Sequence, residues 1–484
     1  MERFILPFIL ACCLPVLSAA YGEDQTQTDA GAVATAFAHG GRFKMLYDAR
    51  QRPQAVLLHG RLFIVCNGDA RPTSSRKGSA RPMLITCDPE SRRFSKPERP
   101  GPSRSDHHDS PIIRADTENY LHVLHGCHWT PGKHLISDQP VRNDSLKITW
   151  HEGPQVAPRL SYPTVFRISG DRQRIDYRTD GHTGSWICRI SDDNGKTWHG
   201  PDSDVTDLDS KGRPDWSSYQ TRLPSKDGKY LHVAYTGCDD SRNSPEPQRF
   251  FNPRYSKLAS NGWKCNLSYV KINLENGDVS NTDGQVLKPP IDIDDSKTHC
   301  EIWDTEWCGA GIPPAVALDE NDNPAFPHLL SEDSLSEHQY DCVRRVAGAR
   351  KQTPITHSNH NWNSCCLPRD TDDTLHACVV AGESYLEGGY MDRHGGGRIE
   401  KWGSDDKGNH WTKRREVSPN FQHYPGWRFN NVQPVVRPDG SPVDGLLLFY
   451  GWNDQDAPEA TAFLLHEQAG MNPDETILPA ARSN

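Results

Sequence analysis

The sequence predicts an all-β protein that folds as a seven-bladed β-propeller, and three observations lead to this prediction. Turn-forming residues are abundant, with 38 Gly and 37 Pro among 484 residues, and no long stretch shows a convincing helical period. Aromatic residues are also numerous, with 13 Trp, 15 Tyr and 14 Phe, which argues against disorder although only 35% of the chain is hydrophobic. The third observation is a repeated unit of turn and strand. A pair of β-sandwiches is the alternative architecture.

The repeated unit is a polar turn that leads into alternating apolar residues, as in a hairpin with a half-buried strand. The units are spaced by roughly 50–70 residues in most intervals, which suits propeller blades of about four strands each. The wider interval 238–300 carries SRNSPEPQRFFNPRYS, which we interpret as a long inserted loop. The repeated segments are 59–68, 116–126, 170–179, 226–237, 319–330, 370–382 and 438–451.

Two short motifs support this fold. Residues 191–198 read SDDNGKTW and match the pattern S-x-D-x-G-x-T-W, and residues 404–411 read SDDKGNHW, with His in place of Thr. In such a turn the Ser and Asp side chains bind backbone amides, the Gly adopts a positive φ, and the Trp packs beneath. The motifs resemble the Asp boxes of sialidase-like propeller blades. They indicate a fold and carry no catalytic information.

Residues 1–20 are typical of a signal peptide, with Arg3 before an apolar stretch at 4–16 and small residues at 18–20. We therefore expect a secreted or periplasmic protein in which 21–484 form a single β-propeller catalytic domain, present as a monomer. No apolar run long enough to span a membrane follows the N-terminus. The net charge of −10 argues against nucleic acid as a partner.

The sequence contains 14 Cys, but no spacing matches a zinc ribbon or a redox motif. Cys66, Cys188 and Cys378 stand in apparent strands and are expected to be small buried apolar residues. Another group could hold a metal ion or form a bridge, although scattered core residues are the favoured interpretation. That group consists of His299, Cys300, Cys308, His328 and Cys342.

Three stretches are rich in reactive side chains: DHHDSP at 106–111, HGCHWTP at 125–131, and SYP at 161–163 with Arg178 downstream. Each alone is weak, because a His beside Gly at a strand end is commonly solvated and a Tyr before Pro is common in β proteins. A propeller, however, directs the ends of its inner strands toward one axial pocket. The three stretches together therefore predict one site.

The order and spacing of these residues resemble the BNR-repeat polysaccharide lyases, a group that includes ulvan lyases and rhamnose–glucuronate lyases with seven-bladed propellers. His108 precedes His128 by 20 residues, and Tyr162 precedes Arg178 by 16. The segments HHDSPII, YLHVLHGCH and SYPTVFRI also resemble this family, and the resemblance spans most of residues 50–455. His134 departs from the pattern, because it stands where an aromatic residue, commonly Tyr, is expected.

The resemblance implies β-elimination on an anionic, uronate-containing polysaccharide of the rhamnose–glucuronate or ulvan kind. Arg178 would neutralise the uronate carboxylate with a bidentate contact, and His108 would donate a further hydrogen bond to it. Tyr162 and His128 would move the protons, and which of them is the base and which the acid stays open. We expect no required cofactor, while a structural metal ion stays an option and the metal content is unknown.

Trp129 and Trp186 are candidates for stacking against sugar rings, and Arg222 for binding a sulfate or a second uronate. A buried Trp and a surface Arg are the simpler interpretations. The site itself is expected to be locally cationic, which would outweigh the negative net charge. A sialidase-like glycoside hydrolase and a non-catalytic carbohydrate-binding propeller are the alternative functions.

Overall fold

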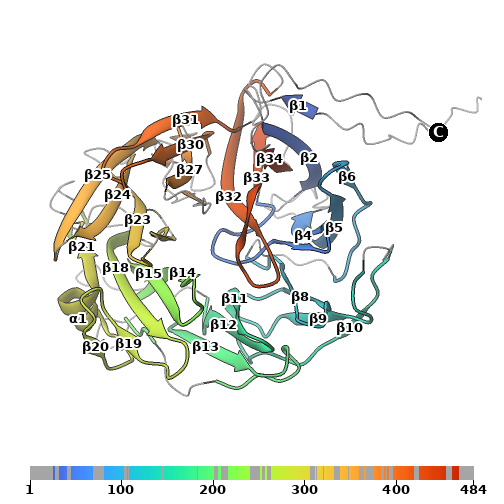
Figure 1. Ribbon diagram of the computed structural model, residues 1–484, viewed down its shortest axis with the longest axis horizontal. Coiled ribbons are helices and arrows are strands. Elements are labelled where there is room, and N and C mark those ends of the chain that lie inside the picture. Colours follow the sequence, from blue (N-terminus) through green and yellow to red (C-terminus); the bar gives the residue numbers. More distant parts are fainter. Residues whose placement is uncertain are drawn as a thin grey trace, which may run out of the picture.

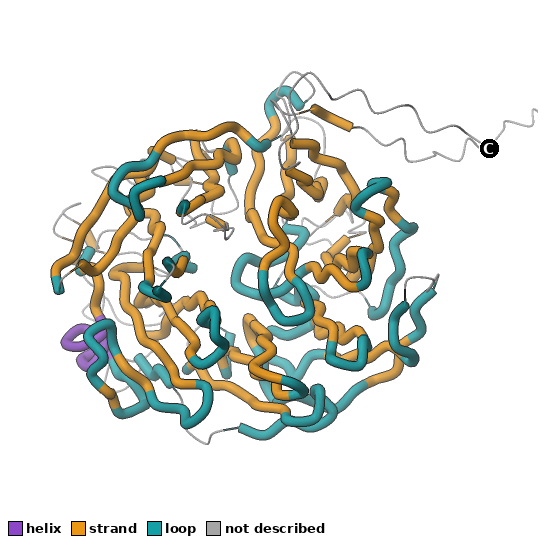
Figure 2. The backbone as a smooth tube through the Cα atoms, in the orientation of Figure 1, coloured by secondary structure: helices purple, strands orange, loops and turns teal. Residues whose placement is uncertain are grey.

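The computed structural model is a ring of antiparallel β-sheets that stand around a central axis, which is the arrangement of a β-propeller (Figure 1). Helical structure in the described residues is confined to α1 (Ile293–Asp295) and the π-helical turn η2 (Ser296–Cys300), at the edge of the ring in Figure 2. The predicted all-β propeller fold is therefore confirmed. None of the helices in the described part of the chain is long and apolar enough to cross a membrane.

The structure describes most of the chain between residues 25 and 467, and the expected signal peptide at 1–20 lies outside the described residues. Most of the stretch 241–256, interpreted above as an inserted loop, also lies outside them. The described residues are 25–27, 32–40, 45–68, 81–102, 106, 108–142, 147–181, 184–200, 205–208, 216–239, 251–252, 257–258, 263–305, 311, 313–319, 321–331, 338–346, 348–358, 365–366, 374–382, 386–387, 390–391, 396–418, 424–453 and 460–467.

The first half of the ring contains sheets whose strands follow one another in the chain and pair antiparallel. This local pairing is what the repeated turn–strand units predict, because a short turn places consecutive strands side by side. The strands of this half are β3 (Ala55–Leu58), β4 (Arg61–Gly68), β5 (Arg81–Asp88) and β6 (Arg93–Phe94); β7 (Ile112–Ala115), β8 (Leu121–His125), β9 (Lys133–Ser137) and β10 (Trp150–Glu152); and β11 (Ser161–Ser169), β12 (Arg172–Arg178) and β13 (Trp186–Ser191).

The second half of the ring continues the same pattern, with two small hairpins added. Its sheets are formed by β14 (Trp216–Pro224), β15 (Tyr230–Asp239), β18 (Trp263–Asn273), β19 (Val279–Ser280), β20 (Val286–Leu287) and β21 (Glu301–Trp303); by β22 (Ala317–Leu318), β23 (Pro324–Ser331), β24 (His338–Val346) and β25 (Ala349–Ser358); and by β26 (Cys365–Cys366), β27 (Leu375–Ala381), β30 (Arg398–Ser404) and β31 (Thr412–Glu416). The hairpins are β16 (Phe251–Asn252) with β17 (Lys257–Leu258), and β28 (Leu386–Glu387) with β29 (Tyr390–Met391).

Strands from the two ends of the described chain close the ring. β2 (Ala32–Gly40) pairs antiparallel with β34 (Ala460–Glu467), which continues the sheet of β32 (Trp427–Val436) and β33 (Pro442–Asn453). On its other edge β2 pairs with β1 (Gln25–Gln27). A single parallel pair, Val56 with Val436, joins this sheet to β3–β6, so that both sets form one nine-stranded sheet. The number of blades, seven, stays a prediction.

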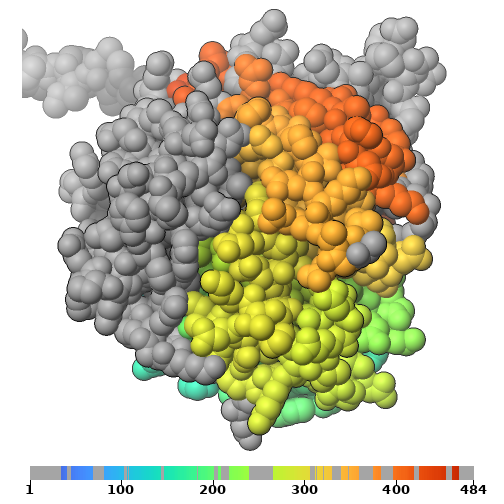
Figure 3. All heavy atoms as spheres, turned by 90° about the vertical axis from the view of Figure 1, so that its left-hand side faces the viewer, coloured from blue at the N-terminus to red at the C-terminus, as the bar shows by residue number. Residues whose placement is uncertain are grey.

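Apolar clusters between neighbouring sheets hold the ring together. Leu267 and Tyr269 of β18 pack with Phe326 of β23 and Val343 of β24, and all four side chains are nearly inaccessible to solvent. Figure 3 shows the atoms of these two sheets in direct contact on one side of the molecule. The burial of such side chains between thin sheets explains how a chain with modest apolar content still forms a core.

The two predicted Asp boxes have the expected geometry. In the box at 191–198 the backbone N–H of Gly195 donates to Ser191 Oγ at 2.7 Å, and Gly195 has φ of 84°. Trp198 packs against an apolar cluster beneath the turn. The serine and glycine of the second box, at 404–411, make the same 2.7 Å hydrogen bond. Each of the repeated turn–strand segments also contains a strand, as predicted.

The cysteines expected in the core are buried. Cys66, Cys188 and Cys378 are at most 2% exposed, and burial raises the pKa of the Cys188 thiol to about 11. In the second cysteine–histidine group, Cys300, His328 and Cys342 are buried as separate core residues, while Cys308 lies outside the described residues. Within the described ranges, the group able to hold a metal ion is instead Asp106, His108 and His128.

Candidate active site

The four side chains predicted to be catalytic meet in one cluster. His108 precedes β7, His128 lies in the loop between β8 and β9, Tyr162 belongs to β11, and Arg178 is the last residue of β12. The ring centres of the two histidines lie 4.4 Å apart, and the Tyr162 ring centre lies 5.6 and 5.7 Å from them. The Arg178 guanidinium carbon lies 4.7 Å from the Tyr162 ring centre. Their catalytic roles stay predictions.

Asp106 bridges the two histidines. His108 Nδ1 donates to Asp106 Oδ1 at 2.8 Å, and His128 Nδ1 donates to Asp106 Oδ2 at 2.9 Å. Burial would raise the pKa of Asp106, but the hydrogen bonds from both rings hold it below its usual range. An ionised carboxylate only accepts hydrogen bonds, so both rings carry a proton on Nδ1. When neutral, each ring therefore has its lone pair on Nε2.

The neighbours of the two rings agree with this tautomer. His128 Nε2 accepts a hydrogen bond from Trp129 Nε1 at 3.2 Å, so that nitrogen carries a lone pair. Burial lowers the pKa of His108 to about 3, with a further decrease from Arg50 and an opposing effect of Asp106. His108 is therefore neutral near pH 7, and it could donate from Nε2 to a substrate only after gaining a proton.

Tyr162 is fully buried, and its hydroxyl has no hydrogen-bond partner among the described residues. Its φ of 56° lies in the left-handed region, which is rare for a bulky side chain and typical of functional sites. Burial raises the pKa of Tyr162, although Arg50 and Arg178 act in the opposite direction. The phenol therefore keeps its proton at neutral pH. An unpartnered buried hydroxyl is a destabilising feature that a catalytic role would explain.

Arg50, a residue that the sequence reasoning did not select, faces the Tyr162 ring with its guanidinium carbon 4.4 Å from the ring centre. Asp48 holds it through hydrogen bonds of 2.7 Å to Nε and 2.5 Å to Nη2. Burial would raise the pKa of Asp48, but the ion pair with Arg50 lowers it to about 2. Both side chains are at most 4% exposed, so the pair is a fixed part of the interior beneath Tyr162.

Arg178 is 0% exposed, and its terminal nitrogens donate to protein groups. Nη1 donates to Ser217 Oγ at 3.3 Å, and Nη2 donates to the carbonyl oxygen of Gly181. A bidentate contact with a substrate would require these bonds to be exchanged. Its charge nevertheless acts on the Tyr162 ring, which it contacts directly.

Positive and negative side chains are both present in this cluster. The two guanidinium groups of Arg50 and Arg178 are matched by the two carboxylates of Asp48 and Asp106. The locally cationic site stays a prediction.

The three predicted substrate-binding residues lie in different environments. The Trp129 side chain is 50% exposed beside His128. Trp186 is 2% exposed and donates from Nε1 to the carbonyl oxygen of Ser218 at 2.8 Å. Arg222 is 6% exposed, with its Nε 3.3 Å from Asp176 Oδ1 and its guanidinium carbon 4.3 Å from the Trp186 ring centre. Only the position of Trp129, of these three, supports direct contact with a substrate.

A hollow of about 260 Å³ begins at Thr130, the residue that follows Trp129 in the chain. It is lined by residues 130–134 and 152–155, and its rim includes an ion pair of 2.6 Å between Lys133 Nζ and Glu152 Oε1. This hollow, together with the exposed indole of Trp129, offers a surface on which a sugar next to the reacting one can lie.

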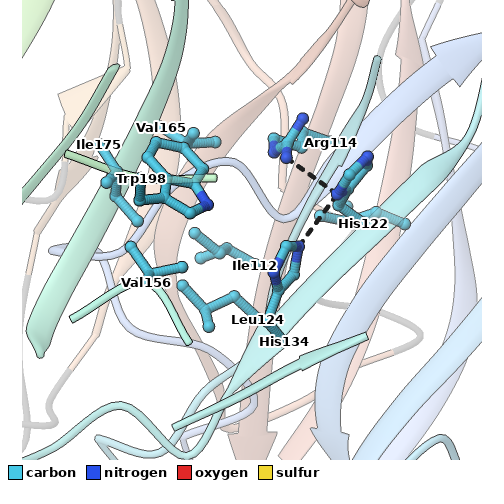
Figure 4. A pocket seen from close by; sticks show the side chains of 10 residues that line it. Ile112, Arg114, His122, Leu124, His134, Val156, Val165, Ile175 and Trp198 are labelled. Atoms are coloured by element: carbon cyan, nitrogen blue, oxygen red, sulfur yellow. Dashed lines mark hydrogen bonds between the residues drawn. The ribbon is translucent and has the colours of Figure 1, made fainter. Parts of the chain in front are cut away.

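His134, the residue that departs from the family pattern, also belongs to a buried network with His122 and Arg114 (Figure 4). Its Nε2 lies 3.0 Å from His122 Nδ1, which also lies 2.8 Å from Arg114 Nη2. Burial lowers the pKa of His134 to about 4. The three side chains line a small cavity of about 20 Å³ together with apolar residues and Trp198 of the first Asp box. Arg114 Nη2 also donates to the carbonyl oxygen of Asn194 at 3.3 Å, so the network joins the sheet of β7, β8 and β9 to the first Asp box.

Residues 88–358 match the family described as BNR repeat-containing family member. An ulvan lyase from Alteromonas sp. (strain LOR) is 22% identical over 311 residues, covering 58% of this chain and 57% of that protein. An ulvan lyase of the PL25 family from Pseudoalteromonas sp. (strain PLSV) is 22% identical over 232 residues, covering 42% and 44%. The chain spans about half the length of these curated relatives.

Solved structures share the fold. A PL25 ulvan lyase superposes with a TM-score of 0.68 at 16% identity, covering 90% of this chain and 96% of that one. The same kind of enzyme bound to -[GlcA(1-4)Rha3S]- gives a TM-score of 0.68 at 15% identity, with the same coverage. The polysaccharide lyase Uly1 gives 0.56 at 12% identity, covering 89% and 94%.

Proposed function

This chain belongs to the BNR repeat-containing family, and on that basis we propose that it is a polysaccharide lyase acting by β-elimination on a uronate-containing, ulvan-like polysaccharide. The observation that carries the proposal is the convergence of two histidines, a buried tyrosine and two arginines on one point. The curated relatives are named ulvan lyases, and a similar solved enzyme is bound to a glucuronate–rhamnose sulfate unit. These names support a glucuronate next to rhamnose as the substrate.

In the proposed reaction His128 is the base. Its Nε2 has a lone pair, and the ionised Asp106 on Nδ1 stabilises the positive charge that develops when the ring takes up a proton. His128 would remove the proton at C5 of the uronate, and the electron pair of that C–H bond would form the C4–C5 double bond. The C4–O bond would break at the same time, and its electron pair would leave with the oxygen.

Tyr162 is the proposed acid. Its phenol keeps its proton at neutral pH, and its hydroxyl makes no competing hydrogen bond to the described residues. It would donate that proton to the oxygen leaving C4. The resulting phenolate would be stabilised by Arg50 and Arg178, whose guanidinium carbons lie within 5 Å of its ring centre. A proton passed from His128 to Tyr162 would then restore the resting state.

The uronate carboxylate must be neutralised for C5 to become acidic. We propose that Arg178 and a protonated His108 do this, since a bound carboxylate favours the charged form of a nearby imidazole. Binding of the substrate would then bring one proton into the site. Trp129 and the hollow that begins at Thr130 would hold the next sugar. We also propose that the protein is secreted or periplasmic, on the basis of the residues at 1–20.

The test is to incubate the purified chain with ulvan and with rhamnose–glucuronate gums. The 4,5-unsaturated uronate produced by elimination absorbs in the ultraviolet, whereas a hydrolysis product does not. His128→Ala should lower the rate by at least about 100-fold, since a general base contributes that much or more. His151→Ala is the matched control, because His151 Nδ1 makes the same kind of 2.9 Å contact with Asp138 on the surface.

Two results would contradict the proposal. Reducing ends released without ultraviolet absorbance would indicate a glycoside hydrolase. Binding of the polymer, with neither absorbance nor new reducing ends from any gum, would indicate a carbohydrate-binding propeller.

A further inference from the structure

The three groups Asp106, His108 and His128 bring two imidazole nitrogens and a carboxylate oxygen within 4.8 Å of one another. We propose that this cluster binds a divalent transition-metal ion of the Zn²⁺ type, and that the bound ion switches the site off. The inhibitory part of this inference rests on the proposed function, whereas the binding part does not.

The donor set favours this class of ion. Two nitrogens and one carboxylate oxygen suit Zn²⁺, Co²⁺, Ni²⁺ and Cu²⁺, whereas Mg²⁺ and Ca²⁺ prefer oxygen ligands. In a tetrahedral site with bonds of about 2.0 Å, ligand atoms stand about 3.3 Å apart. The Asp106 oxygens now lie 2.8 and 2.9 Å from the two Nδ1 atoms. A separation by about half an ångström would therefore admit the ion.

Access and charge are also suitable. The Asp106 side chain is 39% exposed, so an ion can approach it from solvent. The two histidine side chains are 11% and 7% exposed, which holds their rings in place for binding. Arg50 is ion-paired with Asp48, which reduces its repulsion of a bound cation. Water would complete the coordination in the remaining position.

Metal binding and base catalysis require opposite tautomers of the same rings. In the geometry described above, each Nδ1 carries a proton that it donates to Asp106. A metal ion needs the Nδ1 lone pair, so the proton of each neutral ring must move to Nε2 and no net proton is released. His128 Nε2 then becomes an N–H group. It can neither accept from Trp129 nor remove a proton from a substrate.

The test is a titration of the untagged, full-length chain with Co²⁺, whose visible absorption bands report tetrahedral coordination by nitrogen and oxygen. One equivalent of Co²⁺ should produce these bands, and Zn²⁺ should remove them by competition, while Mg²⁺ should not. His128→Ala and Asp106→Asn should each abolish the bands at equimolar Co²⁺. His151→Ala should keep them, because its His–Asp pair lies elsewhere on the surface. Circular dichroism checks that each variant is folded.

The proposal is overturned if no bands appear with the folded wild-type chain, or if they persist in both cluster variants. In the activity assay, Zn²⁺ should inhibit elimination, and EDTA should restore at least 90% of the rate. If Zn²⁺ inhibits Asp106→Asn as strongly as wild type, the inhibition does not arise from this cluster and the inhibitory part of the proposal is wrong. A chain that shows the Co²⁺ bands but no eliminase activity would retain the metal site and refute only the proposed function.

Discussion

The guanidinium carbon of Arg50 lies 4.4 Å from the centre of the Tyr162 ring, although the two residues are far apart in the chain. The backbone explains this proximity. Arg52 N donates to the carbonyl oxygen of Pro163, and Val165 N donates to the carbonyl oxygen of Arg52. The segment before β3 is therefore bound to the start of β11, and Arg50 is carried to the face of the tyrosine ring.

Variants of the Asp48–Arg50 pair should show that the effect of Arg50 on kcat is distinct from its effect on the free energy of unfolding. Arg50→Gln leaves Asp48 buried without its partner, and should lower the free energy of unfolding by about 3–5 kcal/mol. The double variant Asp48→Asn with Arg50→Gln should recover most of this loss, yet kcat should stay about 10²–10³-fold lower because the phenolate loses a cation. Urea unfolding and steady-state kinetics provide the two measurements.

Arg345→Gln serves as the control for these variants, because Arg345 forms a surface pair of 2.9 Å with Asp283. It should change stability by less than about 1 kcal/mol. A double variant with wild-type kcat would show that Arg50 does not assist the reaction.

Tyr162→Phe should inactivate the chain without weakening its fold. The hydroxyl is buried and has no hydrogen-bond partner among the described residues, so its removal should raise the free energy of unfolding by about 1 kcal/mol. Formation of the unsaturated product should fall by about 10²–10⁴-fold through loss of the acid. Tyr340→Phe, at another fully buried tyrosine, is a control for the assay. A Tyr162→Phe protein that is clearly less stable would mean that the hydroxyl has a structural role.

His328 should make the protein less stable in acid. Burial lowers the pKa of His328 to about 3, and neither ring nitrogen has a partner among the described residues. Above pH 6.5 the ring is neutral in both states, so it has no effect. Between pH 6.5 and about 3 the unfolded chain binds a proton that the folded chain does not. The free energy of unfolding therefore decreases as the pH is lowered through this range.

His328→Leu should remove this dependence. Relative to wild type, the variant should gain about 2 kcal/mol between pH 7 and pH 5, as measured by urea unfolding at both values. His151→Leu, which changes an exposed ring, should keep the wild-type difference. If His328→Leu and the wild type lost the same free energy of unfolding between pH 7 and pH 5, His328 would not be a cause of the acid sensitivity.

The first Asp box should be intolerant of a side chain at Gly195. A Cβ there would collide with Arg114 Nη2, which is restrained by its contacts with His122 and Asn194, in addition to the strain of φ at 84°. Gly195→Ala should lower the free energy of unfolding by more than about 2 kcal/mol, with a matching decrease in melting temperature. Gly277→Ala is matched in φ, at 83°, but has open space around its Cβ, and should cost only about 1 kcal/mol. If the two variants lost the same free energy of unfolding, backbone strain alone would explain the loss.

Local patterns in the sequence were enough to predict the Asp boxes and the turn–strand units. Ser191 and Gly195 make their contacts within one turn, so a short motif contains all the information. His108, His128, Tyr162 and Arg178 could be selected because their spacing resembles a known family.

Features that depend on long-range packing could not be read in this way. Asp106 stood in a selected stretch, but its bridging position depends on the loop that carries His128. Asp48 and Arg50 have no local signal, since their significance comes from the contact with β11. The burial of Trp186 and Arg222 likewise follows from strands that pair around them, and a sequence does not distinguish an inward from an outward Trp on such strands.

The closure of the ring has a consequence for the order in which the site assembles. The closing sheet also holds the segment that carries Arg50, because Asn431 Nδ2 donates to the carbonyl oxygen of Tyr47 at 3.0 Å, and the Tyr47 ring contacts that of Tyr450. Asn431 belongs to β32 and Tyr450 to β33, which are translated after all the strands of the middle blades. A nascent chain can thus bind the segment of Arg50 to β11 early, but the contacts that hold this segment from the closing sheet form only after β33 has left the ribosome.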